Sequence, residues 1–238
     1  VVEQLMVLLS EVVSTVLPVR PETFGSSDDR LLEPAQLPGA LSRVLDHVAA
    51  QLEVAPPPLY LSQSLGPRAI PMPSRRERLV VGSELLLLDD EARLAFVIAR
   101  ALSCANAGRR LIYGRRGAEL RTVILGTLAS VRPSLAAPDD DGSIAAFRQA
   151  LERSDVDRDR LARLLDALFT KERRINLSQW IRAVHCTSAR VGTLVCGDLL
   201  AALEAVSGDE VTRRDLVDFA LGGRYTILRE RLGLALAG

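Results

Sequence analysis

The side chains that most readily bind a transition metal or act as nucleophiles are few in this chain. It contains three cysteines and two histidines, and Cys104, Cys186 and Cys196 are not spaced as in a disulfide framework. We therefore expect buried, reduced thiols, as in a cytoplasmic protein. His47 lies beside the apolar face of a helical segment and is expected at the surface. Cys104 and His185 are both capable of ligating a metal.

Motifs of the common enzyme classes are missing from the sequence. It has no G-x-S-x-G nucleophile elbow, no G-x-x-x-x-G-K phosphate-binding loop and no G-x-G-x-x-G after a strand. The acidic stretch 138–142 (PDDDG) lacks the alternating ligands and the terminal Glu of a calcium loop. We interpret it as a solvated turn.

The most informative segment runs from residue 59 to residue 104. A strand and a hairpin lead through a Gly-Ser turn, a leucine-rich turn and an acidic pair into a long apolar helix. This order resembles the zinc endopeptidases of metallopeptidase family forty-eight, which includes the heat-shock protease and the CAAX prenyl protease and has the gluzincin fold. In that family the helix carries the motif L-A-H-E-L-x-H, and the corresponding stretch here is 98–104 (IARALSC).

The family motif supplies the zinc ligands and the general base of the peptidase reaction, and this chain lacks them. Two histidines at i and i+4 share one helical face and hold a zinc ion, while the intervening Glu activates the metal-bound water. By the resemblance, Arg100 replaces the first His, Ala101 replaces the Glu and Cys104 replaces the second His. Arginine keeps its proton and alanine cannot act as a base, so we expect no peptidase reaction.

The resemblance places the third zinc ligand on a later helix. The family pattern E-x-x-A-D-x-x-G corresponds here to 185–192 (HCTSARVG), so that His185 replaces the metal-binding Glu and Ala189 replaces the Asp. Every site residue differs, whereas the apolar residues around the site are retained. We call Arg100, Ala101, Cys104, His185 and Ala189 the peptidase-like positions.

Two hypotheses follow for function. The first is a catalytically inactive pseudopeptidase, with no metal or other cofactor, that binds or scaffolds a protein partner or the rest of a longer parent chain. The alternative is a metalloenzyme whose zinc site is rebuilt around Cys104 and His185. Arg100 would replace the charge of the lost zinc and contact a carboxylate such as Glu84 or Asp198, or it would lie on the solvated edge.

Active members of the resembled family bind the substrate as an added strand along a sheet edge, so the peptide-binding edge of this chain would be Ala69, Ile70, Pro71 and Met72. Pro71 and Pro73 are tolerated only at a sheet edge, and each removes a backbone donor.

The apolar spacing predicts a mostly helical α+β fold, a zincin-like helical domain with one small sheet or hairpin at about residues 58–82. We expect Asp89 or Asp90 to cap a helix that runs to about residue 107, with Gly108 as its stop. Residues 21–38 are expected as a polar loop. The strands are expected at 59–62, 68–73 and 78–82, with a turn at 74–76. The remaining helices are expected at 3–17, 39–53, 117–131, 143–153, 155–170, 176–206, 212–221 and 224–236.

Composition limits the class of partner. The 238 residues include 30 basic and 30 acidic side chains, and the absence of a basic excess argues against nucleic acid or an anionic membrane as the main partner. Neither a signal peptide nor an apolar stretch long enough to span a membrane is visible.

Arginine-rich composition and reduced thiols favour a bacterial, cytoplasmic protein. We expect 1–238 to be a single peptidase-like domain of a longer chain, with 1–37 and 205–238 as helical extensions outside the resemblance.

Overall fold

The structure is a computed structural model of the chain that describes residues 1–27, 30–74, 77–135, 138–139, 141–171 and 176–234. Part of the expected hairpin turn (75–76), Asp140 of the acidic stretch and the last residues of the expected final helix lie outside the described residues. Two compact units are formed by the chain. The first comprises Val1–Arg20, Pro73–Arg76 and Asn106–Ile181, and the second comprises Pro21–Met72, Glu77–Ala105 and Arg182–Gly238. The expectation of a single domain over 1–238 stays a prediction.

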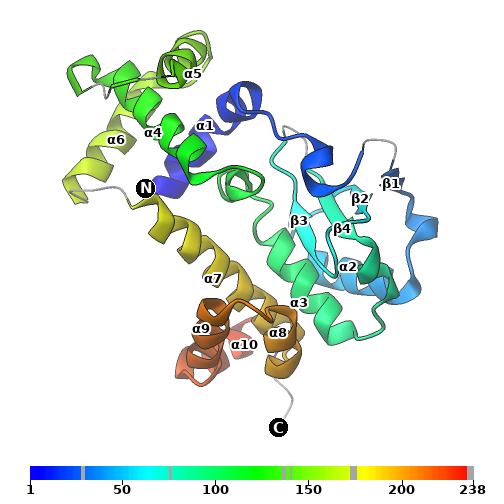
Figure 1. Ribbon diagram of the computed structural model, residues 1–238. Coiled ribbons are helices and arrows are strands. Elements are labelled where there is room, and N and C mark those ends of the chain that lie inside the picture. The colour runs from blue at the N-terminus through cyan, green and yellow to red at the C-terminus, as the bar shows by residue number, and fades with distance from the viewer. Residues whose placement is uncertain (28–29, 75–76, 136–137, 140, 172–175, 235–238) are drawn as a thin grey trace. The chain divides into compact units, whose positions relative to one another are not determined.

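Helices dominate the described residues, with one small sheet (Figure 1), which confirms the expected mostly helical α+β class. The helices are α1 Val2–Val16, α2 Gly39–Gln51, α3 Glu91–Leu102, α4 Gly117–Val131, α5 Ser143–Glu152, α6 Arg158–Lys171, α7 Leu177–Cys196, α8 Leu199–Ala205, α9 Glu210–Ala220 and α10 Gly223–Arg231. The strands are β1 Leu31–Leu32, β2 Leu59–Ser62, β3 Ala69–Pro71 and β4 Leu79–Gly82.

The first unit is a helical assembly of α1, α4, α5 and α6, which bury one apolar face each. Its largest fully buried side chain is Phe147 of α5, which belongs to one apolar cluster with residues of the three other helices. Arg158, at the start of α6, donates hydrogen bonds to Ser130 Oγ at 2.9 Å and to the Leu151 carbonyl at 2.6 Å. These bonds connect α6 to the ends of α4 and α5. The buried core consists of Leu5, Met6, Leu9, Val12, Val13, Leu111, Val123, Ile124, Phe147, Leu151, Leu161, Leu165 and Leu168.

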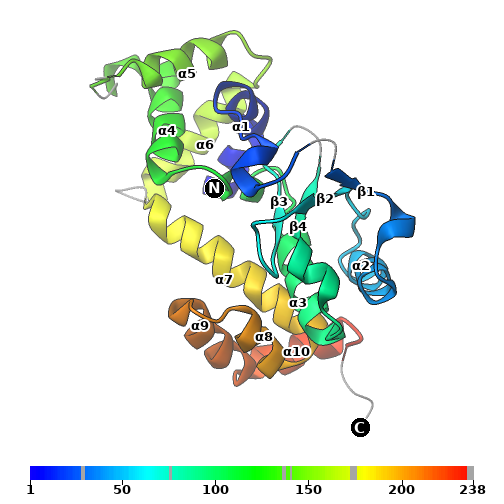
Figure 2. The same cartoon turned by 45° about the vertical axis from the view of Figure 1, so that its right-hand side comes forward.

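The sheet belongs to the second unit and has the strand order β1-β2-β4-β3. Strands β2 and β4 are parallel, with Leu59 opposite Leu79, while β1 and β3 are antiparallel to their neighbours. Because side chains alternate along a strand, Leu59, Leu79 and Val81 share one face, and this face packs against α2 and α3 (Figure 2). The edge position expected for Pro71 is confirmed, since β3 is an outer strand.

Several boundaries differ from the expected ones, among them the end of the last helix, since α10 ends at Arg231. Helix α3 ends at Leu102, so the expected stop at Gly108 was wrong. The expected single helix 176–206 is two helices, because Gly197 adopts a φ of 69° and Asp198 caps α8 by accepting a hydrogen bond from the Ala201 backbone at 3.0 Å. The expected polar loop contains β1, in which Leu31 pairs with Tyr60 of β2.

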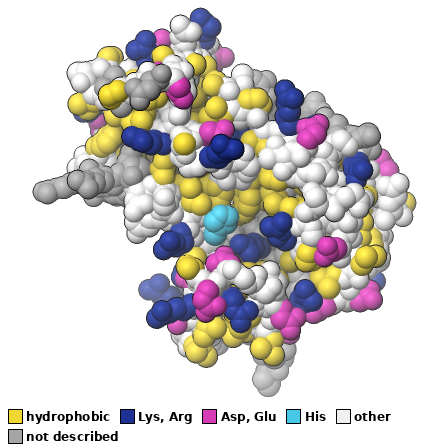
Figure 3. All heavy atoms as spheres, viewed as in Figure 1, with side chains coloured by type: hydrophobic (Ala, Val, Ile, Leu, Met, Phe, Trp, Pro, Cys, Tyr) yellow, Lys and Arg dark blue, Asp and Glu magenta, His cyan; other side chains and the backbone are white. Residues whose placement is uncertain are grey.

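The described residues include no helix that is both long and apolar enough to cross a membrane. On the face drawn in Figure 3, basic and acidic side chains are interspersed with apolar ones, and no broad area carries a single sign of charge. This distribution agrees with the balanced charge of the whole sequence.

Candidate functional site

Helix α3 carries two of the peptidase-like positions, Arg100 and Ala101, and it is held by an N-terminal cap and by burial. Asp90 is its N-cap and accepts a hydrogen bond from the Arg93 backbone at 3.0 Å, as expected. Ala101 has an exposed fraction of 1% and Cys104 of 0%, whereas Arg100 is only partly buried. Cys104 lies beyond the end of the helix, in a turn where its N–H bonds to the Ala101 carbonyl at 3.0 Å. The helical i, i+4 relation of the zinc motif therefore does not extend to Cys104.

Helix α7 approaches α3 closely at a glycine. A Cβ built on Gly192 would lie 2.8 Å from both Cδ2 and the carbonyl oxygen of Phe96. Ala189, one turn earlier on α7, is completely buried, as is Phe96. Small side chains on this face of α7 thus allow the two helices to pack within the second unit, where His185 and Arg100 are near enough for their charges to interact.

The charges around His185 come from two other helices, α3 and α9. Burial is the main cause that lowers the pKa of His185, the charge of Arg100 lowers it further, and the carboxylate of Asp209 acts in the opposite direction. Asp209 is the N-cap of α9 and accepts hydrogen bonds from the Thr212 backbone at 3.0 Å and from its hydroxyl at 2.6 Å. Asp209 is therefore a carboxylate whose charge interacts with that of Arg100, and the expected contact of Arg100 with Glu84 or Asp198 stays a prediction.

The pKa of Asp209 reflects the same cluster. Burial acts to raise it, but the hydrogen bonds from Thr212, followed by the charges of Arg100 and His185, outweigh burial and lower the pKa. Asp209 therefore stays ionised at neutral pH beside the permanent cation of Arg100 and the imidazole of His185. We call Arg100, His185 and Asp209 the α3–α7–α9 charge cluster. Sequence reasoning missed Asp209, although an Asp three residues before a Thr at a helix start is a recognisable capping pattern.

The residues at the peptidase-like positions do not fit the zinc site of the resembled family. That site needs three neutral or anionic ligands around one ion, whereas Arg100 is a permanent cation and Cys104 is enclosed beyond the helix end. Within the ranges that the structure describes, no three His, Cys, Asp or Glu side chains are grouped so that they could hold one metal ion.

The other thiols lie on α7 and are partly buried. Burial raises the pKa of Cys196 to about 11. Burial and then the charge of Asp215 also raise the pKa of Cys186. Asp215 in turn pairs with Arg190, whose Nε donates to Asp215 Oδ2 at 2.9 Å. Both thiols are therefore protonated at neutral pH and are weak nucleophiles.

The expected peptide-binding edge is the outer strand β3 with Met72. The Met72 N–H bonds to the Arg78 carbonyl and the Gly82 N–H bonds to the Arg68 carbonyl, both at 2.9 Å. In an antiparallel ladder this pattern turns the backbone groups of Ile70 toward β4 and those of Ala69 and Pro71 toward the outer edge. Ala69 therefore offers a donor and an acceptor, whereas Pro71 offers only an acceptor.

Burial reduces the number of residues on this edge that a peptide could reach. Pro71 is buried and Met72 has an exposed fraction of 3%, whereas Ala69 and Ile70 are partly exposed. A bound strand would thus find its backbone partners mainly at Ala69.

Comparisons of the chain with protein-family models, with curated proteins and with solved structures found no match.

Proposed function

We propose that this chain is a catalytically inactive, peptidase-like module that binds a protein partner or another part of a longer parent chain. The proposal includes a bacterial, cytoplasmic setting, which rests on the arginine-rich composition. It also includes the absence of a resident metal and of peptidase activity.

The observation that carries the proposal is the interaction of Arg100 with His185. By the resemblance these two residues occupy positions of zinc ligands, and their charges interact across the packed helices α3 and α7. A guanidinium there supplies the positive charge that zinc would supply, and Asp209 balances it. Since Ala101 replaces the Glu that activates water in the resembled family, we expect no peptidase reaction.

Metal content is the first test. Elemental mass spectrometry of the untagged protein, purified without chelator, should find far less than one zinc or other transition metal per chain. Stoichiometric metal in a folded sample would contradict the proposal and favour the alternative site around Cys104 and His185.

A single substitution tests whether the peptidase-like positions converge. Arg100→His removes the cation and adds a second imidazole near His185, and imidazole nitrogens are zinc ligands. Arg100→Gln is the matched control, because it removes the charge without adding a strong ligand. We expect zinc titration to show tighter binding by R100H than by R100Q. Equal zinc affinities of the two variants would show that the side chains at the peptidase-like positions cannot bind one zinc ion together.

Peptide binding at the β3 edge is tested by removing one donor. Ala69→Pro deletes the outward N–H of Ala69, while Ala69→Val keeps it and adds similar bulk. A peptide selected from a displayed library on the full chain should lose affinity for A69P and keep it for A69V. Equal binding to both variants would place the partner elsewhere on the chain.

A further inference from the structure

A cavity of about 520 Å³ lies in the first unit, between α1 and the connection from α5 to α6. Its floor is apolar and is formed by Leu8, Val12 and Val16 of α1 together with Ala150 and Val156. These α1 residues recur every four positions, so they share one helical face. The floor therefore follows α1 for about 12 Å at 1.5 Å per residue.

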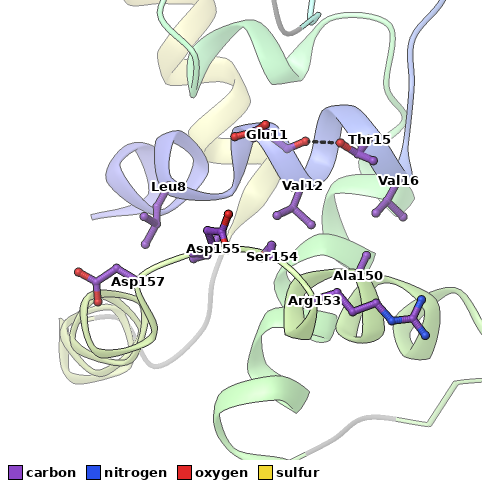
Figure 4. A pocket seen from close by; sticks show the side chains of 11 residues that line it. Leu8, Glu11, Val12, Thr15, Val16, Ala150, Arg153, Ser154, Asp155 and Asp157 are labelled. Carbon is purple, nitrogen blue, oxygen red and sulfur yellow. Dashed lines mark hydrogen bonds between the residues drawn. The ribbon is translucent and has the colours of Figure 1, made fainter.

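The rim of this cavity is charged unevenly. Glu11, Asp155 and Asp157 contribute carboxylates, and all three residues are exposed. Arg153 contributes the cation of the rim, and it extends at the opposite end of the cavity from Asp157 (Figure 4). Asp155 projects from the connection toward α1 near Leu8 (Figure 4). One end of the groove is thus acidic and the other is basic.

We propose that this groove, which we call the α1 groove, binds a basic amphipathic helix of a protein partner. An elongated apolar floor beside a helix suits apolar side chains at i, i+4 and i+7 of a second helix. The acidic end selects lysine or arginine on the flank of that helix, because opposite charges across an interface favour association and like charges oppose it. The bound helix is oriented with its basic flank near Leu8 and Asp157 and away from Arg153.

The α1 groove is independent of the function proposed above, since its residues belong to the first unit and the peptidase-like positions belong to the second. The two proposals can fail separately.

The direct test is fluorescence anisotropy with the full chain at low ionic strength. The probe is a labelled helical peptide of about four turns with leucines at i, i+4 and i+7 and lysines on the flank at one end. The control peptide has glutamates in place of the lysines. We expect the lysine peptide to bind and the glutamate peptide to bind at least about fivefold more weakly, with a difference that shrinks as salt is added.

Substitutions of acidic and basic rim residues should change the affinity for the lysine peptide in opposite directions. Glu11→Gln combined with Asp155→Asn should weaken binding of the lysine peptide about fivefold. Arg153→Gln should strengthen it, which a general loss of folding could not do. Asp159→Asn is the matched control: this exposed carboxylate lies two residues from Asp157 and outside the cavity lining, and its loss should have no effect.

Several results would overturn the proposal. These are equal binding of both peptides, no binding of either, or equal losses with Asp159→Asn and the rim variants. Self-association of the chain that Leu8→Arg abolishes, without any peptide binding, would instead identify the groove as an interface between two copies. Circular dichroism of each variant confirms that it is folded.

Discussion

The guanidinium of Arg115 donates two hydrogen bonds to the carbonyl oxygen of Leu17, from Nη2 at 2.7 Å and from Nε at 3.2 Å. Leu17 is the C-cap of α1, so this contact closes the end of a helix that lies 98 residues earlier in the chain. Nη1 also reaches the Leu111 carbonyl at 3.4 Å. Burial lowers the pKa of Arg115 to about 10, while the carboxylate of Glu119 acts to raise it.

Arg115→Met should lower the free energy of unfolding by about 1–3 kcal/mol, because it leaves the Leu17 carbonyl without its donors. Arg115→Lys should recover only part of this loss, since lysine keeps the charge but cannot form the forked contact. Urea unfolding of both variants measures the difference. Equal stability of R115K and the wild-type chain would show that charge alone matters at this position.

Gly192→Ala should destabilise the second unit by about 1–3 kcal/mol, because the added methyl group forces Phe96 or the backbone of α3 to move. Gly223→Ala is the matched control: a Cβ at this helical position meets nothing within 4 Å. It should be neutral or slightly stabilising. Thermal unfolding compares the two, and a G192A chain as stable as G223A would contradict the close packing of α3 and α7.

His185 should make the free energy of unfolding decrease as the pH falls below the ordinary pKa of histidine. Burial and Arg100 lower its pKa in the folded chain, so below about pH 6.5 the unfolded chain binds a proton that the folded chain does not. The loss stops once the pH falls below the folded pKa. His185→Gln should reduce this pH dependence, measured as the difference in unfolding free energy between about pH 7.5 and pH 5.5.

Two further substitutions test whether the charges of Arg100 and Asp209 cause this pH dependence. Arg100→Gln should raise the pKa of His185 and reduce the loss of stability, whereas Asp209→Asn should lower the pKa and increase the loss. His47→Gln, at an exposed position of α2, is the control. A pH profile of H185Q identical to that of the wild-type chain would exclude His185 as the group responsible.

Arg229→Met should weaken the junction of α7 and α8. Its Nη1 donates to the Leu194 carbonyl at 2.7 Å, in the last turn of α7. Loss of this partly buried, charge-assisted bond should cost about 1–2 kcal/mol, measured by urea unfolding. Arg231→Met, an exposed residue of the same helix, is the control and should change stability little.

Local sequence signals predicted much of the fold. Periodic apolar residues located α1, α2 and α4, and of the two expected caps of α3, Asp89 and Asp90, the structure confirms Asp90. The strands β2, β3 and β4 were expected at nearly their observed bounds, because alternating apolar residues between prolines and glycines are typical of strands. Pro71 correctly indicated an outer strand, since it cannot donate to a ladder.

The elements that were missed depend on contacts distant in the sequence. β1 has only two residues and exists because Leu31 pairs with Tyr60. The end of α7 is set by the left-handed backbone of Gly197, and Arg229 of α10 donates to the Leu194 carbonyl in the last turn of α7. Asp209 joined the charge cluster because α9 packs beside α7, which periodicity alone does not reveal. The resemblance that suggested the peptidase-like positions stays a prediction.

The order of segments in the first unit has a consequence during synthesis. Helix α1 is made before its core partners Leu161, Leu165 and Leu168, which follow about 150 residues later. At roughly 5–20 residues per second, the apolar face of α1 lacks these partners for roughly 8 to 30 seconds of synthesis. A chaperone that shields nascent chains would have a target in Leu5, Leu9 and Val12.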